Sequence, residues 1–260
     1  MMHINDFLSV GSGSLVGFAL GLLGGGGSIL AVPLLIYVVG MKDTHLAIGT
    51  SALAVAANAF ANLTAHHRAG NVKWPCATVF AISGVAGAAA GAALGKAVDG
   101  QQLLFFFGLA MVAVSVAMLH PRTAMGDPDV RITPAIALRL VGIGFIVGLL
   151  SGFFGIGGGF LIVPAIMLGS GMAMLNAVGS SLVSVGAFGL TTAISYALAG
   201  LVDWRVAGFF IAGGILGGIA GTALAGRLAG ERALLTRIFA VAVLAVAAFV
   251  LWRSAPGFFG

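Results

Sequence analysis

The sequence predicts an all-α polytopic membrane protein, built from two homologous repeats whose helices are broken at glycine-rich motifs. Three observations predict this fold class. Of the 260 residues, 60% are hydrophobic and only 7% are charged, against about 25% charged residues in soluble domains. The apolar residues form continuous runs, which excludes the alternating strands of a membrane β-barrel. The third observation is that the chain repeats itself.

The repeat is visible as matching motifs in the same order in both halves. Three pairs of segments correspond: 21–33 with 152–164, 47–51 with 177–181, and 70–74 with 200–204. The first pair shares seven identities in 13 positions. We therefore expect a first transmembrane repeat at 1–125, a polar linker at 126–133 and a second repeat at 134–260.

Each half contains five apolar segments. They are 7–23, 29–39, 46–65, 75–98 and 102–119 in the first half, and 134–154, 160–168, 177–199, 206–228 and 234–251 in the second. A helix needs about 20 residues to cross the hydrocarbon core. The third and fourth segments reach this length, and the first and fifth nearly do. The second segment of each half is too short and follows a glycine cluster, so we expect it to form half a helix.

The basic residues favour opposite orientations for the two repeats. The loop between the third and fourth segments carries Arg68 and Lys73 in the first half but only Arg205 in the second. The loop between the fourth and fifth segments has the opposite bias, with Lys96 against three arginines. Because Lys and Arg mark the cytoplasmic side, we expect inverted repeats with five crossings each. Four crossings per half, with the first two segments forming one broken crossing, is the alternative.

The polar residues exclude several classes of function. All seven carboxylates lie outside the apolar segments, so no acidic proton relay crosses the membrane core. The chain has no nucleophile motif with a base partner and no metal-ligand spacing, so we expect no enzyme, no cofactor and no metal. Its basic residues are scattered, unlike those of nucleic-acid-binding proteins. The expected partners are the lipid bilayer and a small solute, and self-association to a homo-oligomer stays open.

Two glycine clusters, 24–27 and 155–159, interrupt apolar runs at corresponding positions. Each precedes a short helix, whose N-terminus offers free N–H groups and a partial positive charge. Such a terminus binds anions without a charged side chain, and half-helices that meet near the midplane are a recurrent transporter geometry. Close helix packing is the alternative role for these glycines. For the glycines inside the fourth segments we expect packing alone.

Paired hydroxyl groups lie near the start of each third segment, followed by further polar residues one or two turns on. They cap the helix or donate to an anion. The candidate anion-binding residues are Gly26, Gly27, Ser28, Thr50, Ser51, Asn58, Gly157, Gly158, Gly159, Ser180, Ser181 and Ser184.

Two copies of a glycine-rich stretch ending in Val-Pro, each followed by Ala-x-Gly-[Thr/Ser]-Ser and Gly-x-Val-x-Trp, resemble the sulfite exporter TauE/SafE family. The resemblance covers nearly the whole chain. It implies a secondary transporter that exports a small sulfur-containing anion, such as sulfite, thiosulfate or a sulfonate, across a bacterial inner membrane. A passive anion channel and a membrane subunit that assists another protein are the alternatives. The copies differ slightly, since Ser28 stands where the second copy has Gly159.

Overall fold

The apolar runs become helices throughout the part of the chain that the computed structural model describes, residues 4–119, 126–127, 129–155, 159–227 and 232–259. The first half forms α1 (Ile4–Leu23), the 3₁₀ helix η1 (Gly24–Leu30), α2 (Ala31–Tyr37), α3 (Thr44–Arg68), α4 (Trp74–Ala97) and α5 (Gly100–Leu119). The second half forms α6 (Pro134–Phe154), α7 (Gly159–Ser170), α8 (Met174–Ala197), α9 (Trp204–Arg227) and α10 (Arg232–Phe259).

Seven of the described helices are long and apolar enough to cross a membrane, namely α3, α4, α5, α6, α8, α9 and α10. The expected all-α polytopic membrane fold is therefore confirmed. The second segment of each half is short, as expected: α2 has seven residues and α7 has 12, with Pro164 inside it. At 1.5 Å per residue neither reaches across a hydrocarbon core of about 30 Å.

Helix ends follow from local residue chemistry. The Asp43 carboxylate accepts hydrogen bonds from the backbone N–H groups of the first turn of α3. Asp99 and Asp203 do the same at the starts of α5 and α9. Each satisfies N–H groups that the helix itself leaves free. Gly155 ends α6 with a φ of 68°, a left-handed conformation that glycine adopts without a steric penalty. Three carboxylates thus serve as helix caps outside the apolar core.

Glycines bring helices of opposite halves into close contact. Gly13, Gly17 and Gly21 of α1 lie against Phe210, Gly214 and Gly218 of α9. Gly144, Gly148 and Gly152 of α6 lie in the same way against Phe80, Gly84 and Ala88 of α4. In both pairs the residue numbers rise together, so the helices run parallel. A Cβ at any of these six glycines would meet the neighbouring backbone or side chain. The packing role expected for the glycines of the fourth segments is confirmed at Gly84 and Gly214.

The central pair, α3 and α8, runs antiparallel. Gly49 near the start of α3 lies against Tyr196 and Leu201 at the end of α8, whereas Gly186 lies against Phe60. These are the two most buried of the seven candidate spans. The two helices carry the corresponding sequence segments 47–51 and 177–181 near their starts.

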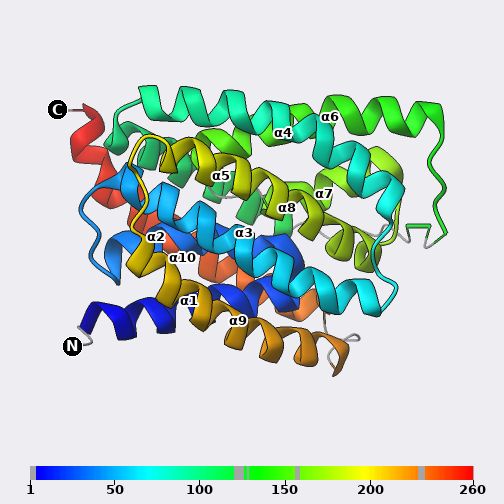
Figure 1. Ribbon diagram of the computed structural model, residues 1–260, viewed down its shortest axis with the longest axis horizontal. Coiled ribbons are helices and arrows are strands. Elements are labelled where there is room, and N and C mark those ends of the chain that lie inside the picture. Colours follow the sequence, from blue (N-terminus) through cyan, green and yellow to red (C-terminus); the bar gives the residue numbers. More distant parts are fainter. Residues whose placement is uncertain (1–3, 120–125, 128, 156–158, 228–231, 260) are drawn as a thin grey trace.

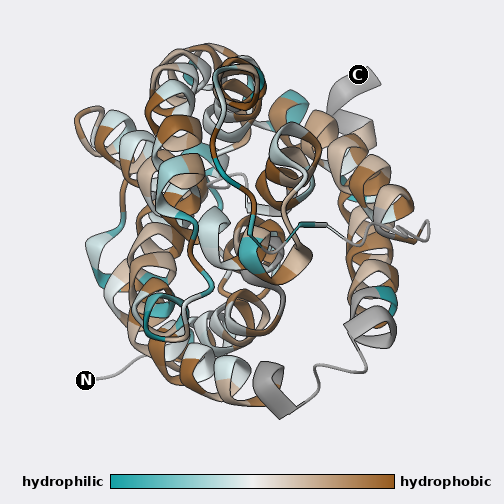
Figure 2. Cartoon of the chain, turned by 90° about the vertical axis from the view of Figure 1, so that its right-hand side faces the viewer, coloured by the Kyte–Doolittle hydropathy of each residue, from teal (hydrophilic) through white to brown (hydrophobic). Residues whose placement is uncertain are grey.

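α1 begins and α10 ends on the left of Figure 1, whereas α6 begins on the right. The halves interleave, since α1 packs on α9, α4 on α6 and α5 on α10. Figure 2 looks along the helices and shows mostly brown, hydrophobic ribbon, with teal residues in the loops at the near end. Polar residues in the middle of the bundle are therefore exceptions that need a reason.

Candidate functional site

The first glycine-rich stretch packs against helices of both halves. Residues 24–30 form η1, which includes the candidates Gly26, Gly27 and Ser28, and η1 packs against α7. Gly27 is buried against the backbone of α1 at Ala19 and Leu20, so a side chain there would collide with the main chain. Ser28 is fully buried. Gly27 therefore has a packing role whatever else it does.

The second glycine-rich stretch is described only in part. Gly157 and Gly158 lie outside the described residues. Gly159 is buried and begins α7. α7 packs against η1, the element that contains the first glycine cluster. Whether the short helices α2 and α7 meet, as the sequence predicts, stays a prediction.

Thr50 and Ser180 make matching contacts with the loops of the opposite half. The Thr50 hydroxyl accepts a hydrogen bond from the backbone N–H of Asp203 at 2.9 Å, and Ser180 accepts one from Lys73 at 2.9 Å. Thr50 also donates its proton to the carbonyl of Leu46, at 2.6 Å. A hydroxyl has one proton to donate, so Thr50 has none left for an anion in this conformation. These two hydroxyls hold the loop before α9 and the loop before α4.

Ser51 and Ser181 bond within their own helices. Ser51 donates to the carbonyl of Ile48 at 2.9 Å, and Ser181 donates to that of Val178 at 2.8 Å.

The two hydroxyl pairs also lie far apart, because α3 and α8 are antiparallel. Thr50 is beside the end of α8, and Ser180 lies level with the last turns of α3. Along α3, the two hydroxyl pairs are therefore separated by about 15 residues, or about 22 Å. The structure does not bring these four residues into one site.

Asn58 and Ser184 behave differently from the other candidates. Both are fully buried, in the middle of α3 and α8 respectively. Among the described residues, the side-chain nitrogen and oxygen of Asn58 have no hydrogen-bond partner, and neither does the Ser184 hydroxyl. Burying an amide without a partner costs about 1–3 kcal/mol by protein mutational data. Such groups in a native protein call for an explanation, and a transient ligand is one.

The neighbours of Asn58 explain how the amide fits into the bundle. Its amide nitrogen lies directly over Gly214 of α9, and Gly214 in turn lies against Gly17 of α1. One turn further along α3, the side-chain amide nitrogen of Asn62 donates to the backbone carbonyl of Asn58 at 2.9 Å. The Asn62 side chain lies over Gly218. The missing side chains of these glycines leave room for two amides where α1, α3 and α9 meet.

The equivalent place in the other half is apolar. Phe188 occupies the position in α8 that Asn58 occupies in α3. Its ring lies over Gly84 and stacks on Phe80, with ring centroids 6.1 Å apart. The repeat therefore places a polar amide on one side of the central helix pair and a phenyl ring on the other. Asn58 is the candidate at which the two halves differ most in chemistry.

The structure adds a group that the sequence interpretation missed. Tyr196, near the end of α8, is fully buried, and its hydroxyl has no partner among the described residues. The His45 ring lies 6.3 Å from the tyrosine ring, and the Lys96 ammonium lies 5.8 Å from it. Lys96 also donates to the carbonyl of Ser195 at 2.9 Å. The sequence does contain a signal that could have identified this residue, because Tyr196 places a polar hydroxyl inside the apolar segment 177–199.

Among the described residues, no three His, Cys, Asp or Glu side chains lie close enough together to hold one metal ion. The ion pairs of this part of the chain lie at the ends of the bundle. Arg205 and Asp6 join the starts of α9 and α1 at 2.8 Å, and Lys73 and Asp129 are 3.9 Å apart. The middle of the described membrane core therefore presents neutral donors only.

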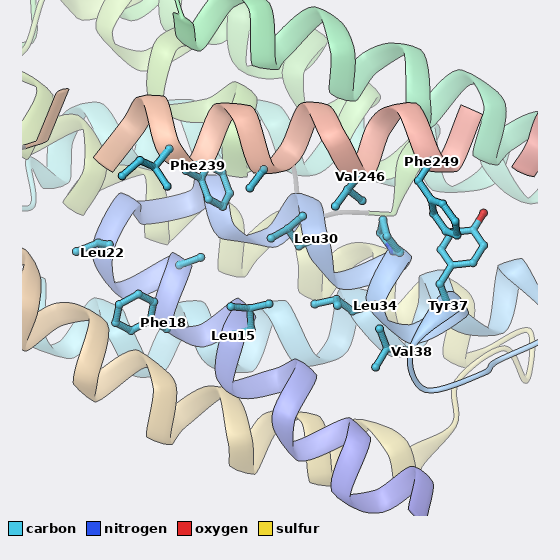
Figure 3. Close-up of a pocket in the computed structure, with 14 residues that line it drawn as sticks. Leu15, Phe18, Leu22, Leu30, Leu34, Tyr37, Val38, Phe239, Val246 and Phe249 are labelled. Atoms are coloured by element: carbon cyan, nitrogen blue, oxygen red, sulfur yellow. The ribbon is translucent and has the colours of Figure 1, made fainter. Parts of the chain in front are cut away.

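A groove of about 500 Å³ lies between α1, α2 and α10 (Figure 3). Of its 14 lining residues, 13 are apolar, and the exception is Tyr37. A small anion needs hydrogen-bond donors when it leaves water, and this groove does not supply them. It is therefore separate from the polar groups around Asn58.

Comparison with known proteins places the chain among membrane transporters. The family model described as "Sulfite exporter TauE/SafE" matches residues 9–250. A "Probable membrane transporter protein" of Xylella fastidiosa is 52% identical over 248 residues, which cover 95% of both chains. A protein of that description from Methanocaldococcus jannaschii is 30% identical over 74% of this chain and 71% of its own. One from Bacillus subtilis is 28% identical over 82% and 85%. No solved structure matches the chain.

Proposed function

The chain belongs to the sulfite exporter TauE/SafE family of membrane transporters, and from this premise we propose its substrate and mechanism. It is a secondary transporter that exports a small sulfur-containing anion, such as sulfite, thiosulfate or a sulfonate, across a bacterial inner membrane. It carries out no chemical reaction on that anion. Its substrate site lies around Asn58, in the middle of the bundle.

The observation that carries this proposal is the buried amide of Asn58 without a protein partner. An amide NH₂ supplies two donors to an anion, and a hydrogen bond to a charged group contributes about 1.5–3 kcal/mol. Neutral donors suit a transported anion because the substrate must leave as well as bind. Ser184, on the antiparallel helix α8, is the second buried donor that we assign to the site.

The repeat supports alternating access as the mechanism. Antiparallel packing of the equivalent helices α3 and α8 supports an inverted arrangement of the halves. In transporters of this kind the substrate site lies near the midplane, and one repeat moves against the other around it. The glycine contacts of α1 with α9 and of α4 with α6 are smooth surfaces along which such a movement can occur.

Reconstitution of the pure chain into liposomes tests the proposal. We expect uptake of radiolabelled sulfite or thiosulfate that saturates with concentration and shows counterflow. Flux that does not saturate would indicate a passive channel. If liposomes with correctly folded protein show no flux of any sulfur anion, the carrier proposal is wrong and the chain works as a subunit of another protein.

The same liposomes test the site. Asn58→Leu should abolish counterflow, whereas Phe188→Leu, at the equivalent position of the other half, should retain it. Both variants place a leucine in the middle of α3 or α8, and Asn and Phe have similar helix propensities, so the two substitutions are matched in that respect. Equal loss in both variants would contradict the assignment of the site to Asn58.

A further inference from the structure

The groove between α1, α2 and α10 is almost entirely apolar, so it has no role in binding the transported anion. It runs along α10 from Phe249 past Val246 and Ala242 to Ile238. That distance is 11 residues, or about 16 Å. One leaflet contributes about 15 Å to the hydrocarbon core. The groove is therefore long enough to hold most of one acyl chain.

The lining matches an acyl chain in chemistry as well as in length. Leu15, Phe18 and Leu22 of α1 form one wall, and Phe239 and Val246 of α10 form the opposite wall (Figure 3). Several lining residues stay exposed although they belong to the groove, among them Leu15 at 50% and Ile238 at 58%. Since α10 is a candidate membrane span, what surrounds this open side is lipid.

One end of the groove carries the groups that meet a phospholipid headgroup. Tyr37 packs edge-on against Phe249, with ring centroids 4.9 Å apart, and both lie at this end. Arg253 lies one helical turn beyond Phe249, on the same face of α10, and is exposed. Trp252 beside it is 72% exposed. Exposed Trp and Tyr are typical of the membrane–water interface, and nearby basic residues bind lipid phosphates.

We propose that this groove is a phospholipid-binding site, in which one acyl chain lies between α1, α2 and α10 and the phosphate meets Arg253 and Tyr37. An anionic phospholipid binds most tightly there because Arg253 supplies positive charge. The bound chain fills the space between α10 and the short helix α2, which follows the glycine-rich segment η1. This lipid is a structural partner and is distinct from the transported anion.

Native mass spectrometry of the detergent-purified protein tests the proposal with phosphatidylglycerol and phosphatidylethanolamine as probes. We expect one phosphatidylglycerol to remain bound to the wild type. Ala242→Trp fills the groove and should remove this adduct. Val241→Trp is the matched control, because Val241 is the neighbouring residue, is 58% exposed and does not line the groove. An adduct that survives equally in both variants would overturn the proposal.

Charge variants locate the headgroup. Arg253→Gln should weaken binding of phosphatidylglycerol about fivefold, the effect of one basic residue near a membrane surface. Arg237→Gln, at the opposite end of the groove, should leave binding unchanged. The reverse result would place the headgroup at the wrong end and contradict the assignment to Arg253.

A labelling experiment without substitutions covers the case in which a tryptophan variant does not fold. Phosphatidylglycerol with a photoactivatable group in the middle of one acyl chain is incorporated into membranes that contain the wild-type protein. We expect cross-links to concentrate in peptides of α1, α2 and α10. Cross-links spread evenly over other lipid-facing helices, such as α4 and α9, would show that the groove holds no particular lipid.

Discussion

Two places in the repeat show what the halves keep and what they change. Where each third helix meets the loop of the opposite half, the chemistry is the same: Thr50 holds the loop at Asp203, and Ser180 holds the loop at Lys73. In the middle of the same helices the chemistry differs, because Asn58 stands opposite Gly214 and Phe188 stands opposite Gly84. The contacts that hold the halves together are duplicated, whereas the buried amide of Asn58, which we assign to the substrate site, has a phenyl ring as its counterpart in the other half.

The largest expected effect is on substrate affinity at Asn58. Asn58→Leu removes the amide donors and keeps the side-chain size nearly constant. Loss of one hydrogen bond to a charged group corresponds to about 1.5–3 kcal/mol, or about 10- to 150-fold in affinity. The thermal stability of the free protein should stay the same or rise, since an unpartnered buried amide disappears. A thermal-shift titration with sulfite and thiosulfate measures both quantities.

Unchanged affinity in Asn58→Leu would end the assignment of a substrate role to this residue. Lower stability without loss of affinity would show that the amide is bonded inside the protein after all. The matched variant Phe188→Leu should lose some packing against Phe80 while affinity remains.

A smaller effect is expected at the duplicated contacts, and on stability rather than affinity. Thr50→Val keeps the shape of the side chain but leaves the N–H of Asp203 without its acceptor, which costs about 1–3 kcal/mol. Ser180→Ala should destabilise the protein by a similar amount, through the N–H of Lys73. Chemical denaturation in detergent checks whether the two losses are equal. If either variant loses affinity while keeping full stability, its hydroxyl contacts the substrate instead of the loop.

These expectations show how far the sequence could lead. It predicted the helices closely, because continuous apolar runs form helices in a membrane; the predicted segment 134–154, for example, coincides with α6. It also predicted that the second segment of each half is short, as α2 and α7 are. It did not predict that Thr50 and Ser180 bond to loops of the opposite half, since residues 50 and 203 are far apart in sequence and only the antiparallel packing of α3 and α8 joins them.

Tyr196 gives the smallest expected effect. Its hydroxyl is buried and unpartnered, so Tyr196→Phe should leave the free energy of unfolding unchanged or raise it by at most about 1 kcal/mol. If the hydroxyl meets the anion near Lys96 and His45, the variant should transport more slowly while remaining stable. Unfolding and liposome flux measured on the same preparation separate these effects. A clear loss of stability would show that the hydroxyl has a structural partner.

The central claim is that the anion binds in the middle of the bundle, at the position where the two halves differ. An experimental structure with bound selenite, a sulfite analogue that carries an anomalous signal, tests this most directly. The account predicts anomalous density within hydrogen-bond distance of the Asn58 amide nitrogen. Density confined to one end of the bundle, for example beside Lys96, with none at Asn58, would contradict it.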